Sequence, residues 1–148
     1  MISLVEINEE NYREVCSLKV FDEQKGFVAP AVSILARAYA KRGLGAEALA
    51  IANGDVIVGV VMYLGFSCYA IEQFLIDHRY QNQGFGKQAL ALVMDKLRHE
   101  LKYDTVEICV KKEAAQALSM YKAYGFYDTG HDGPDEPDSY CLRYDFPK

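Results

Sequence analysis

Residues 72–90 of the chain read EQFLIDHRYQNQGFGKQAL, and this stretch is the most informative part of the sequence. An apolar run ends a strand predicted over residues 69–76, a polar loop follows, and glycines open a helix expected over residues 84–101. Glycine lets the backbone turn so that several N–H groups point at one spot, and the helix N-terminus adds a partial positive charge. A strand, a loop and a helix in this order predict a site for phosphate or pyrophosphate.

Three phosphate-binding patterns compete for this loop. The P-loop pattern G-x-x-x-x-G-K-[ST] is excluded, because Gly86-Lys87 has no Ser or Thr after it and no glycine five residues before Gly86. The dinucleotide pattern G-x-G-x-x-A matches Gly84, Gly86 and Ala89, but too little sequence follows for a doubly wound sheet. The third pattern, Q-x-x-G-x-G, is formed by Gln81, Gly84 and Gly86 after the apolar strand.

Hydrophobic periodicity, caps and turn signals predict the other elements. Strands are expected over residues 2–7, 46–52, 56–64, 105–110 and 140–146, and helices over residues 9–19, 31–42 and 114–124. Asn8 is the expected N-cap of the first helix, Pro30 opens the second, and Gly43 closes it. Asn53-Gly54 predicts a hairpin. With 148 residues and no linker or repeat, we expect one mixed α/β domain over residues 1–148.

A second motif supports the third pattern. Ala117-Leu118-Ser119-Met120-Tyr121, followed by Gly125-Phe126, resembles the helix A-x-x-[LF]-Y-x-x-x-G-F of the GNAT superfamily of N-acyltransferases, and the Gln81 loop resembles its acetyl-CoA-binding motif. The resemblance implies an α/β fold with a central, mostly antiparallel mixed sheet. Six to seven strands, about four flanking helices and a splayed strand pair at the cofactor site are implied as well. The segments 22–24 and 26–29 and Ser33 resemble the entry segment of bacterial diamine, spermidine and spermine N-acetyltransferases.

The resemblance implies which residues bind acetyl-CoA. The strand backbone pairs with the pantetheine arm and polarises the thioester, while the loop holds the pyrophosphate. The implied cofactor-binding residues are Phe74, Leu75, Ile76, Gln81, Asn82, Gln83, Gly84, Phe85, Gly86, Lys87, Ala114 and Tyr121. Two positions depart from the family. Asn82 stands where glycine is frequent, and Ala114 stands where an asparagine commonly contacts the cofactor.

Two side chains are candidates for catalysis. Tyr121 resembles the tyrosine that donates a proton to the coenzyme A sulfur, which a phenol with a pKa of about 10 can do at neutral pH. The alternative is an aromatic residue that only packs on an amphipathic helix. Glu72 is the candidate general base for the amine, and the alternative is a solvent-facing strand residue. Tyr63 and Tyr69 are candidates for holding a water molecule beside it.

The charge pattern suggests where two substrates bind. Residues 79–122 hold eight basic and five acidic groups, a net of +3, so the rest of a chain of net charge −5 carries −8. The basic part contains the proposed cofactor motifs, and the acidic part suits a cationic amine. Candidate substrate-binding residues are Glu23, Gln24, Phe27 and Glu72, with further acidic loop residues at Asp22, Asp132, Asp135, Glu136 and Asp138. Amine affinity should therefore weaken as salt rises.

Composition excludes several classes of protein. The acidic net charge disfavours binding to nucleic acid and to anionic lipid, and no segment reaches the ~20 apolar residues of a membrane span. We expect no signal peptide, a cytoplasmic location and isolated, buried thiols. The histidines lack metal-ligand spacing, so no metal site is predicted. The thiols are those of Cys16, Cys68, Cys109 and Cys141, and the histidines are His78, His99 and His131.

The first hypothesis is an acetyl-CoA-dependent N-acetyltransferase that acts on a primary amine of a small di- or polyamine in a ternary complex. A second is an acetyltransferase for another amine, such as an aminoglycoside, an amino acid or a protein N-terminus. A third is a non-catalytic acyl-CoA-binding sensor, which the Ala114 departure keeps open. A dinucleotide-binding module is the fourth. The expected partners are acetyl-CoA and the amine, and the resemblance also suggests a homodimer.

Overall fold

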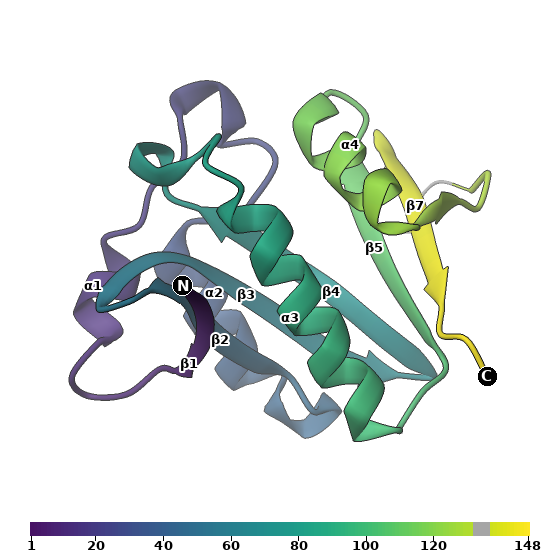
Figure 1. Ribbon diagram of the computed structural model, residues 1–148, viewed down its shortest axis with the longest axis horizontal. Coiled ribbons are helices and arrows are strands. Elements are labelled where there is room, and N and C mark those ends of the chain that lie inside the picture. Colours follow the sequence, from purple (N-terminus) through teal and green to yellow (C-terminus); the bar gives the residue numbers. More distant parts are fainter. Residues whose placement is uncertain (132–136) are drawn as a thin grey trace.

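A seven-stranded sheet organises the part of the chain that the computed structural model describes, residues 1–131 and 137–148 (Figure 1). The strand order is β1-β2-β3-β4-β5-β7-β6. The strands are β1 (Ile2–Glu6), β2 (Glu47–Asn53), β3 (Val56–Phe66), β4 (Cys68–Ile76), β5 (Thr105–Lys111), β6 (Tyr127–Asp128) and β7 (Ser139–Asp145). The α-helices are α1 (Tyr12–Cys16), α2 (Ala31–Ala40), α3 (Phe85–Glu100) and α4 (Ala115–Tyr124). The predicted fold class, a mixed, mostly antiparallel sheet with about four helices, is confirmed for the described residues.

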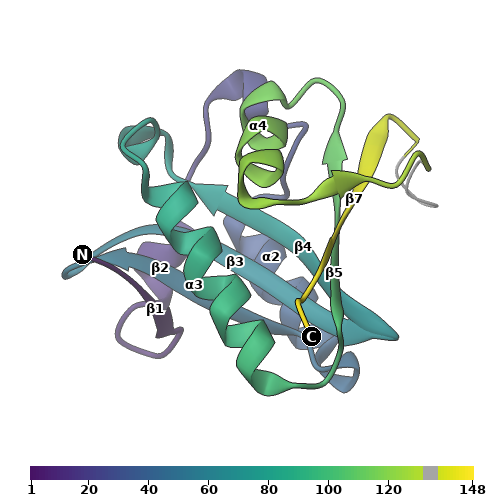
Figure 2. The same ribbon diagram turned by 45° about the vertical axis from the view of Figure 1, so that its right-hand side comes forward.

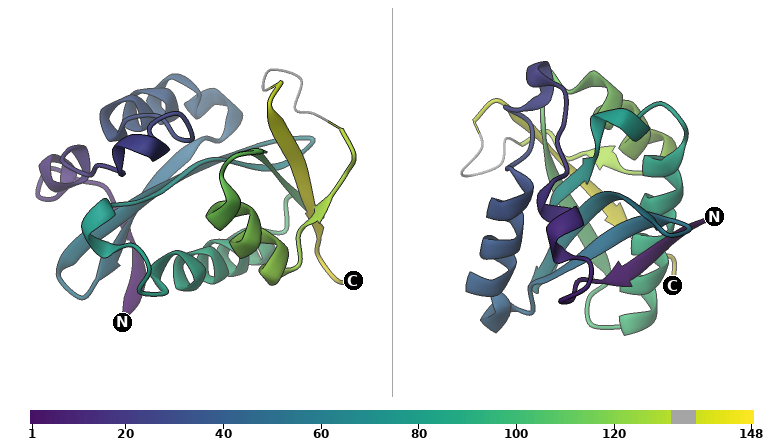
Figure 3. Two further views of the ribbon diagram at one scale, coloured as in Figure 1. Left: turned by 90° about the horizontal axis from the view of Figure 1, so that it is seen from above. Right: turned by 90° about the vertical axis from the view of Figure 1, so that its left-hand side faces the viewer.

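The helices cover the two faces of the sheet in pairs, with α1 and α2 on one face and α3 and α4 on the other (Figure 3). Side chains alternate along each strand, so successive residues enter different cores. In β3, Val60 joins Ile34 of α2 in one core, whereas Val61 joins Leu90 and Met94 of α3 in the other. A core forms on each face of the sheet because the central strands carry apolar side chains on both faces.

The strands β4 and β5 meet at one end and then separate (Figures 1 and 2). They form the parallel pair of this sheet, and their register joins Tyr69 to Val106 and Ala70 to Glu107. Beyond these residues, β3 is the one ladder partner of β4 within residues 1–131 and 137–148. The predicted splayed strand pair is therefore confirmed, and it leaves the rest of the β4 edge available to a ligand.

A β-bulge interrupts β4 near the point of separation. In the pairing with β3, Met62 faces Gln73 and Tyr63 faces Ile71, so Glu72 is the extra residue. A bulge bends the strand and redirects the side chain of the extra residue. Glu72 is therefore placed by the backbone rather than by simple alternation along the strand.

The first two helices are shorter than predicted. Asn8 was expected as an N-cap, but its Oδ1 accepts hydrogen bonds from the amides of Glu10 (2.8 Å) and Asn11 (3.1 Å) and so stabilises a turn before the helix. The helix begins at Tyr12 with Asn11 as its N-cap. The α2 helix ends at Ala40, and the left-handed residue that closes the following turn is Gly45 (φ 73°), not Gly43.

The other boundaries agree to within one or two residues, and the predicted Asn53-Gly54 hairpin is confirmed. Gly54 has a φ of 60°, which glycine adopts without strain. The two-residue strand β6 lies outside the residue ranges that were predicted for strands. Among the described residues, no helix combines the length and the apolar character that crossing a membrane would require.

The expectation of isolated, buried thiols is wrong. All four cysteines are thiols, but Cys109 is exposed and Cys16, Cys68 and Cys141 are partly exposed. Cys109 in β5 also lies directly opposite Cys141 in β7. Where helices cover a strand on a single face, a thiol on the other face of that strand reaches solvent. The apolar neighbours of the cysteines in the sequence do not show which face is covered.

Candidate active site

A cavity of about 510 Å³ is lined by β4 and β5 in the region where the two strands separate. The segment around residues 20–28, the loop before α3 and the start of α4 complete its walls. All but one of the residues predicted for cofactor binding, catalysis and direct substrate binding line this cavity, the exception being Gln83. The lining residues are Glu23, Gln24, Phe27, Glu72, Phe74, Leu75, Ile76, Gln81, Asn82, Gly84, Phe85, Gly86, Lys87, Ala114 and Tyr121. The candidate cofactor and substrate residues thus share one cavity.

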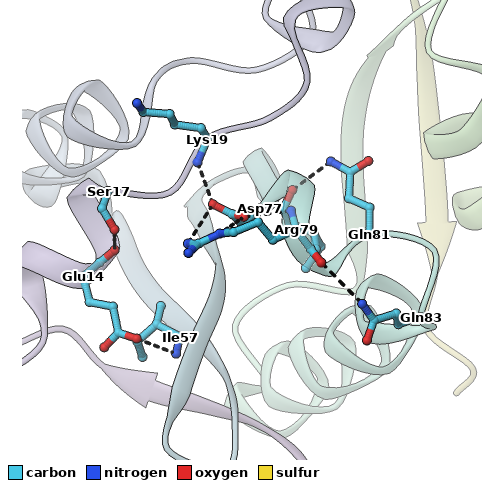
Figure 4. Close-up of polar contacts among 9 residues, drawn as sticks. Glu14, Ser17, Lys19, Ile57, Asp77, Arg79, Gln81 and Gln83 are labelled. Atoms are coloured by element: carbon cyan, nitrogen blue, oxygen red, sulfur yellow. Dashed lines mark hydrogen bonds and ion pairs between the residues drawn. The ribbon is translucent and has the colours of Figure 1, made fainter.

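The loop that follows β4 is anchored at its first residue, Asp77, which is 1% exposed (Figure 4). Its Oδ1 accepts hydrogen bonds from the Arg79 amide (2.9 Å) and Nε (2.8 Å), and its Oδ2 accepts one from the Lys19 amide (3.0 Å). In the other direction, the His78 amide donates to the Lys19 carbonyl at 2.7 Å. The Arg79 guanidinium therefore pairs with Asp77 and helps to hold the loop.

The electrostatics of Asp77 reflect this anchoring. Burial alone would raise the pKa of Asp77, but the hydrogen bonds from Arg79 and from the Lys19 backbone outweigh it, so the pKa lies below its ordinary value. Asp77 is therefore ionised at neutral pH. The start of the loop is fixed by charge-assisted hydrogen bonds rather than by apolar packing alone.

Gln81 connects the loop to two other parts of the site. Its Nε2 donates to the Ile76 carbonyl (2.9 Å) and to Gln24 Oε1 (2.8 Å), and Gln24 Nε2 donates back to Gln81 Oε1 (2.9 Å). Gln24 belongs to the entry segment, which was predicted to contact the acceptor. This reciprocal amide pair therefore joins the candidate acceptor side to the candidate cofactor loop.

The glycine-to-asparagine departure at residue 82 is compatible with the loop. Asn82 has a φ of 63° and Gly84 a φ of 81°, so both lie in the left-handed region. Asparagine tolerates this conformation better than most residues. Asn82 Oδ1 also accepts a hydrogen bond from Gln116 Nε2 of α4, so the side chain links the loop to the opposite wall of the cavity. Gln83 Nε2 donates to the Arg79 carbonyl instead.

The first turn of α3 faces the cavity. Phe85, Gly86 and Lys87 line it, and no side chain in the described part of the chain caps the helix start at Gly84. The unpaired first-turn amides and the helix dipole favour an anion there. A side chain at residue 86 would press on Met120 Sδ, which would lie 3.2 Å from its Cβ. Glycine therefore keeps α3 close to α4 at this point.

Tyr121 is placed on the wall of the cavity by α4. It is 3% exposed, and its ring packs edge-on against Phe74 and Phe126 with centroids 6.4 and 5.6 Å away. Its hydroxyl has no hydrogen-bond partner among the described residues. Since no side-chain polar atom is sealed there without a partner, the hydroxyl opens onto the cavity. Burial raises the pKa of Tyr121, so the hydroxyl is a proton donor at neutral pH.

Glu72 lines the cavity and also forms an ion pair with Lys41. Lys41 Nζ donates to both carboxylate oxygens of Glu72, at 3.0 and 3.1 Å. The Glu72 side chain is 28% exposed and that of Lys41 is 42% exposed, so water reaches the pair. Lys41 follows α2 and does not line the cavity. A cation already occupies the carboxylate that was predicted to receive the amine.

Two groups of predicted residues lie elsewhere. Tyr63 and Tyr69 line a separate cavity of about 230 Å³, with their hydroxyls bonded to Glu47 Oε2 (3.0 Å) and to the Lys102 amide (3.1 Å). They face the α3 side of the sheet and cannot hold water at Glu72. Of the acidic loop residues, Asp22 pairs with Lys25, whereas Asp132, Asp135 and Glu136 lie outside the described residues.

Several site residues were not predicted. These are Lys41, Gln73 and Gln116. Each forms a hydrogen bond with a predicted residue or segment that is far away in the sequence, so no local sequence pattern indicates the contact. Gln73 Oε1, for example, accepts from the Ala29 amide at 2.9 Å and holds the entry segment against β4. Ala114, the other departure, is buried and has no side chain to contact a ligand by a polar bond. Among the described residues no cluster suited to a metal ion is present.

Comparison with known proteins places this arrangement in a family. A family model described as the Acetyltransferase (GNAT) family matches residues 3–126. The spermine/spermidine N(1)-acetyltransferase of Bacillus subtilis (strain 168) is 29% identical over 87 residues. The match covers 53% of this chain and 57% of that relative, so this chain spans little more than half of the relative's length.

Solved structures agree with the fold. An acetyltransferase from Agrobacterium tumefaciens str. C58 superposes with a TM-score of 0.78 at 14% identity, covering 97% of this chain and 90% of that one. PaiA N-acetyltransferase from Thermoplasma acidophilum, solved in complex with coenzyme A, gives a TM-score of 0.74 at 12% identity over 99% of both chains. With most of its length matched by the family model and its sheet shared with these enzymes, the chain belongs to the GNAT family of acetyltransferases.

Proposed function

We propose that the protein transfers the acetyl group of acetyl-CoA to a primary amine of a small di- or polyamine, by direct attack in a ternary complex. The observation that carries the proposal is the single cavity that Tyr121, the loop before α3, Glu23 and Glu72 line together. On the acetyl-CoA side, the reaction needs a proton donor for the sulfur and a site for the anionic phosphates. On the acceptor side, it needs carboxylates that attract the cationic amine. The described residues supply both groups within one cavity.

The residues around the cavity fit acetyl-CoA. The β4 edge beyond Ala70 offers main-chain groups to an amide-containing arm, and the left-handed loop residues with the first turn of α3 suit a pyrophosphate. Phe74, Leu75 and Ile76 would hold the arm, and the cavity-lining residues of the segment 81–87, which exclude Gln83, would hold the phosphates. Acetyl-CoA supplies the activated acetyl thioester.

Two side chains carry the proton movements of the proposed reaction. A carboxylate oxygen of Glu72 accepts a proton from the acceptor ammonium, which gives a neutral amine able to attack. The Tyr121 hydroxyl donates its proton to the sulfur as the carbon–sulfur bond breaks. The raised pKa of Tyr121 keeps this proton in place at neutral pH. The acceptor ammonium loses one proton to Glu72 and a second one when the amide forms, and the second proton restores the Tyr121 hydroxyl. The products are an amide, a thiol and one proton that Glu72 releases to solvent.

The polyamine substrate is supported by charge and by likeness. Glu23 and Glu72 line the cavity, and the matched Bacillus relative is named for acting on spermine and spermidine. A carboxylate pair favours acceptors with more than one positive charge. An acceptor such as a neutral or anionic amine would gain nothing from these groups.

The test is a thiol-release assay with acetyl-CoA across an amine panel. Spermidine, spermine and putrescine should support turnover, with a KM that rises as salt increases from low to physiological ionic strength. Amino acids, an aminoglycoside and a peptide with a free N-terminus serve as competitors at equal concentration. No thiol release with any amine would overturn the enzyme proposal, and preference for an uncharged acceptor would overturn the polyamine part.

Replacing Lys41 with Met should lower the KM for spermidine about two- to fivefold, with kcat changed less. The reason is that Lys41 competes with the acceptor for the Glu72 oxygens, and a partly exposed ion pair contributes only about 0.5–1 kcal/mol. Steady-state kinetics at low salt measures this. The Lys41→Arg variant keeps the ion pair and is the control. An unchanged or higher KM in Lys41→Met would show that Lys41 does not compete.

A further inference from the structure

Cys109 lines the cavity and lies opposite Cys141 on the neighbouring strand, and the proposed reaction uses neither thiol. Cys109 lies in β5 and Cys141 in β7, and the antiparallel register places them directly opposite each other. Both are thiols in the structure. Directly opposite residues of an antiparallel pair have neighbouring side chains on the same face of the sheet.

The backbone hydrogen bonds show which kind of cross-strand pair this is. The Cys141 amide donates to the His131 carbonyl (3.2 Å), and the Cys141 carbonyl accepts from the Thr129 amide (3.0 Å). Both main-chain groups of Cys141 therefore point away from β5. The Cys109–Cys141 pair is thus a non-hydrogen-bonded pair, in which the Cα atoms approach to about 4.5 Å. A disulfide requires Cα atoms about 4.4–6.8 Å apart, so the backbone is already suitable.

The two side chains also lie on the accessible face. In β5 and β7 the residues Ile108, Val110 and Leu142 point into the core beneath α3 and α4. Alternation along the strands turns Cys109 and Cys141 to the opposite face. Cys109 is exposed and Cys141 is partly exposed, so a small reagent reaches them. The other helix layer packs on β2 and β3 instead.

We propose that Cys109 and Cys141 form a reactive dithiol that closes to a cross-strand disulfide by exchange with a small-molecule disulfide. The Cys109 thiolate attacks one sulfur of the small disulfide and releases one small thiol, which leaves a mixed disulfide on Cys109. The Cys141 thiolate then attacks the Cys109 sulfur and releases the second small thiol. The protein loses two protons and two electrons, and the small disulfide gains them and is reduced to two thiols.

The disulfide would form at the wall of the acetyl-transfer cavity. Cys109 belongs to the stretch of β5, residues 108–111, that lines this cavity on the side opposite β4. Because the two strands already lie at ladder distance, closure needs no rearrangement of the sheet. The modification site therefore reaches the cavity wall through Cys109, while neither cysteine has a role in the proposed acetyl transfer.

The experiment is a redox titration with oxidised and reduced glutathione, quenched by alkylation and read by intact mass and peptide mapping. The expected result is a protein that carries two alkyl groups fewer than the fully reduced and alkylated protein, with the peptides of Cys109 and Cys141 linked. The linked fraction should rise with the oxidised share of glutathione. The Cys16→Ser and Cys68→Ser variants should give the same link. Cys109→Ser and Cys141→Ser should give none and should retain glutathione on the remaining thiol.

Three outcomes would overturn the proposal. The first is that both thiols stay fully alkylated at every glutathione ratio. The second is that the wild-type protein accumulates glutathione on Cys109 without resolution by Cys141. The third is a disulfide that joins a different pair, such as Cys68 with Cys141. Circular dichroism of each serine variant, compared with the wild type, shows that the fold is intact before the result is interpreted.

Discussion

Replacing Tyr121 with Phe should lower kcat for acetyl transfer by about 10²–10⁴-fold while acetyl-CoA binding is retained. The hydroxyl opens onto the cavity and makes no hydrogen bond to the described residues, so its removal leaves no unpaired group behind. The ring keeps its contacts with Phe74 and Phe126, which preserves the packing of α4. Steady-state kinetics and a thermal shift with acetyl-CoA measure the two quantities separately.

The Tyr124→Phe variant is the matched control. Tyr124 lies one turn further along α4 and packs on Phe126 and Tyr144 outside the cavity. Its kcat should remain within a few-fold of the wild type. If Tyr121→Phe keeps its kcat, the hydroxyl is not the proton donor, and water or another group must protonate the sulfur. If acetyl-CoA binding is lost as well, Tyr121 acts in binding rather than in proton transfer.

Replacing Asp77 with Ala should lower the free energy of unfolding by about 2–4 kcal/mol. The side chain is 1% exposed and accepts from the Lys19 and Arg79 amides, so its removal takes the acceptor away from two part-buried donors. The loop before α3 would lose its anchor, and acetyl-CoA binding should weaken too. Urea denaturation at neutral pH measures the stability. A loss below about 0.5 kcal/mol would show that water replaces the carboxylate, as at an ordinary surface position.

The same carboxylate gives the stability a pH dependence of known sign. Because the pKa of Asp77 is lower in the folded protein than its ordinary value of 3.8, its contribution is fully present above that value. It is lost as the pH falls through the lower, folded pKa. Asp77→Asn cannot titrate, so the stability difference between wild type and Asp77→Asn should shrink below about pH 4. A difference that stays constant down to pH 2 would contradict this assignment.

Local patterns in the sequence predicted most of the fold. Helix α3 and strands β2 to β5 have strong periodicity or a clear turn, such as Asn53-Gly54, and their boundaries agree with the structure. The first helix was predicted too long because the Asn8 side chain bonds to nearby amides and competes with helix formation. The outcome of that competition depends on contacts that a single-sequence pattern does not contain.

The candidate site was predicted as a set of residues but not as a network. The loop motif and Tyr121 have fixed spacing, so the cavity gathers them as expected. The pairs that set the chemistry of the site join distant segments, for example Lys41 with Glu72 and Gln24 with Gln81. The bulge at Glu72 was also invisible, because it is a property of the register between two strands. Such features depend on tertiary structure alone.

The separation of β4 from β5 has a consequence for the solution behaviour of the protein. It creates a sheet edge inside the molecule, along the β4 residues that follow Ala70. Unpaired strand edges are templates for association between chains, and most proteins shield them. A ligand arm that pairs with this edge would act as a removable shield. Supply of the acetyl donor would then govern resistance to aggregation as well as the rate of the reaction.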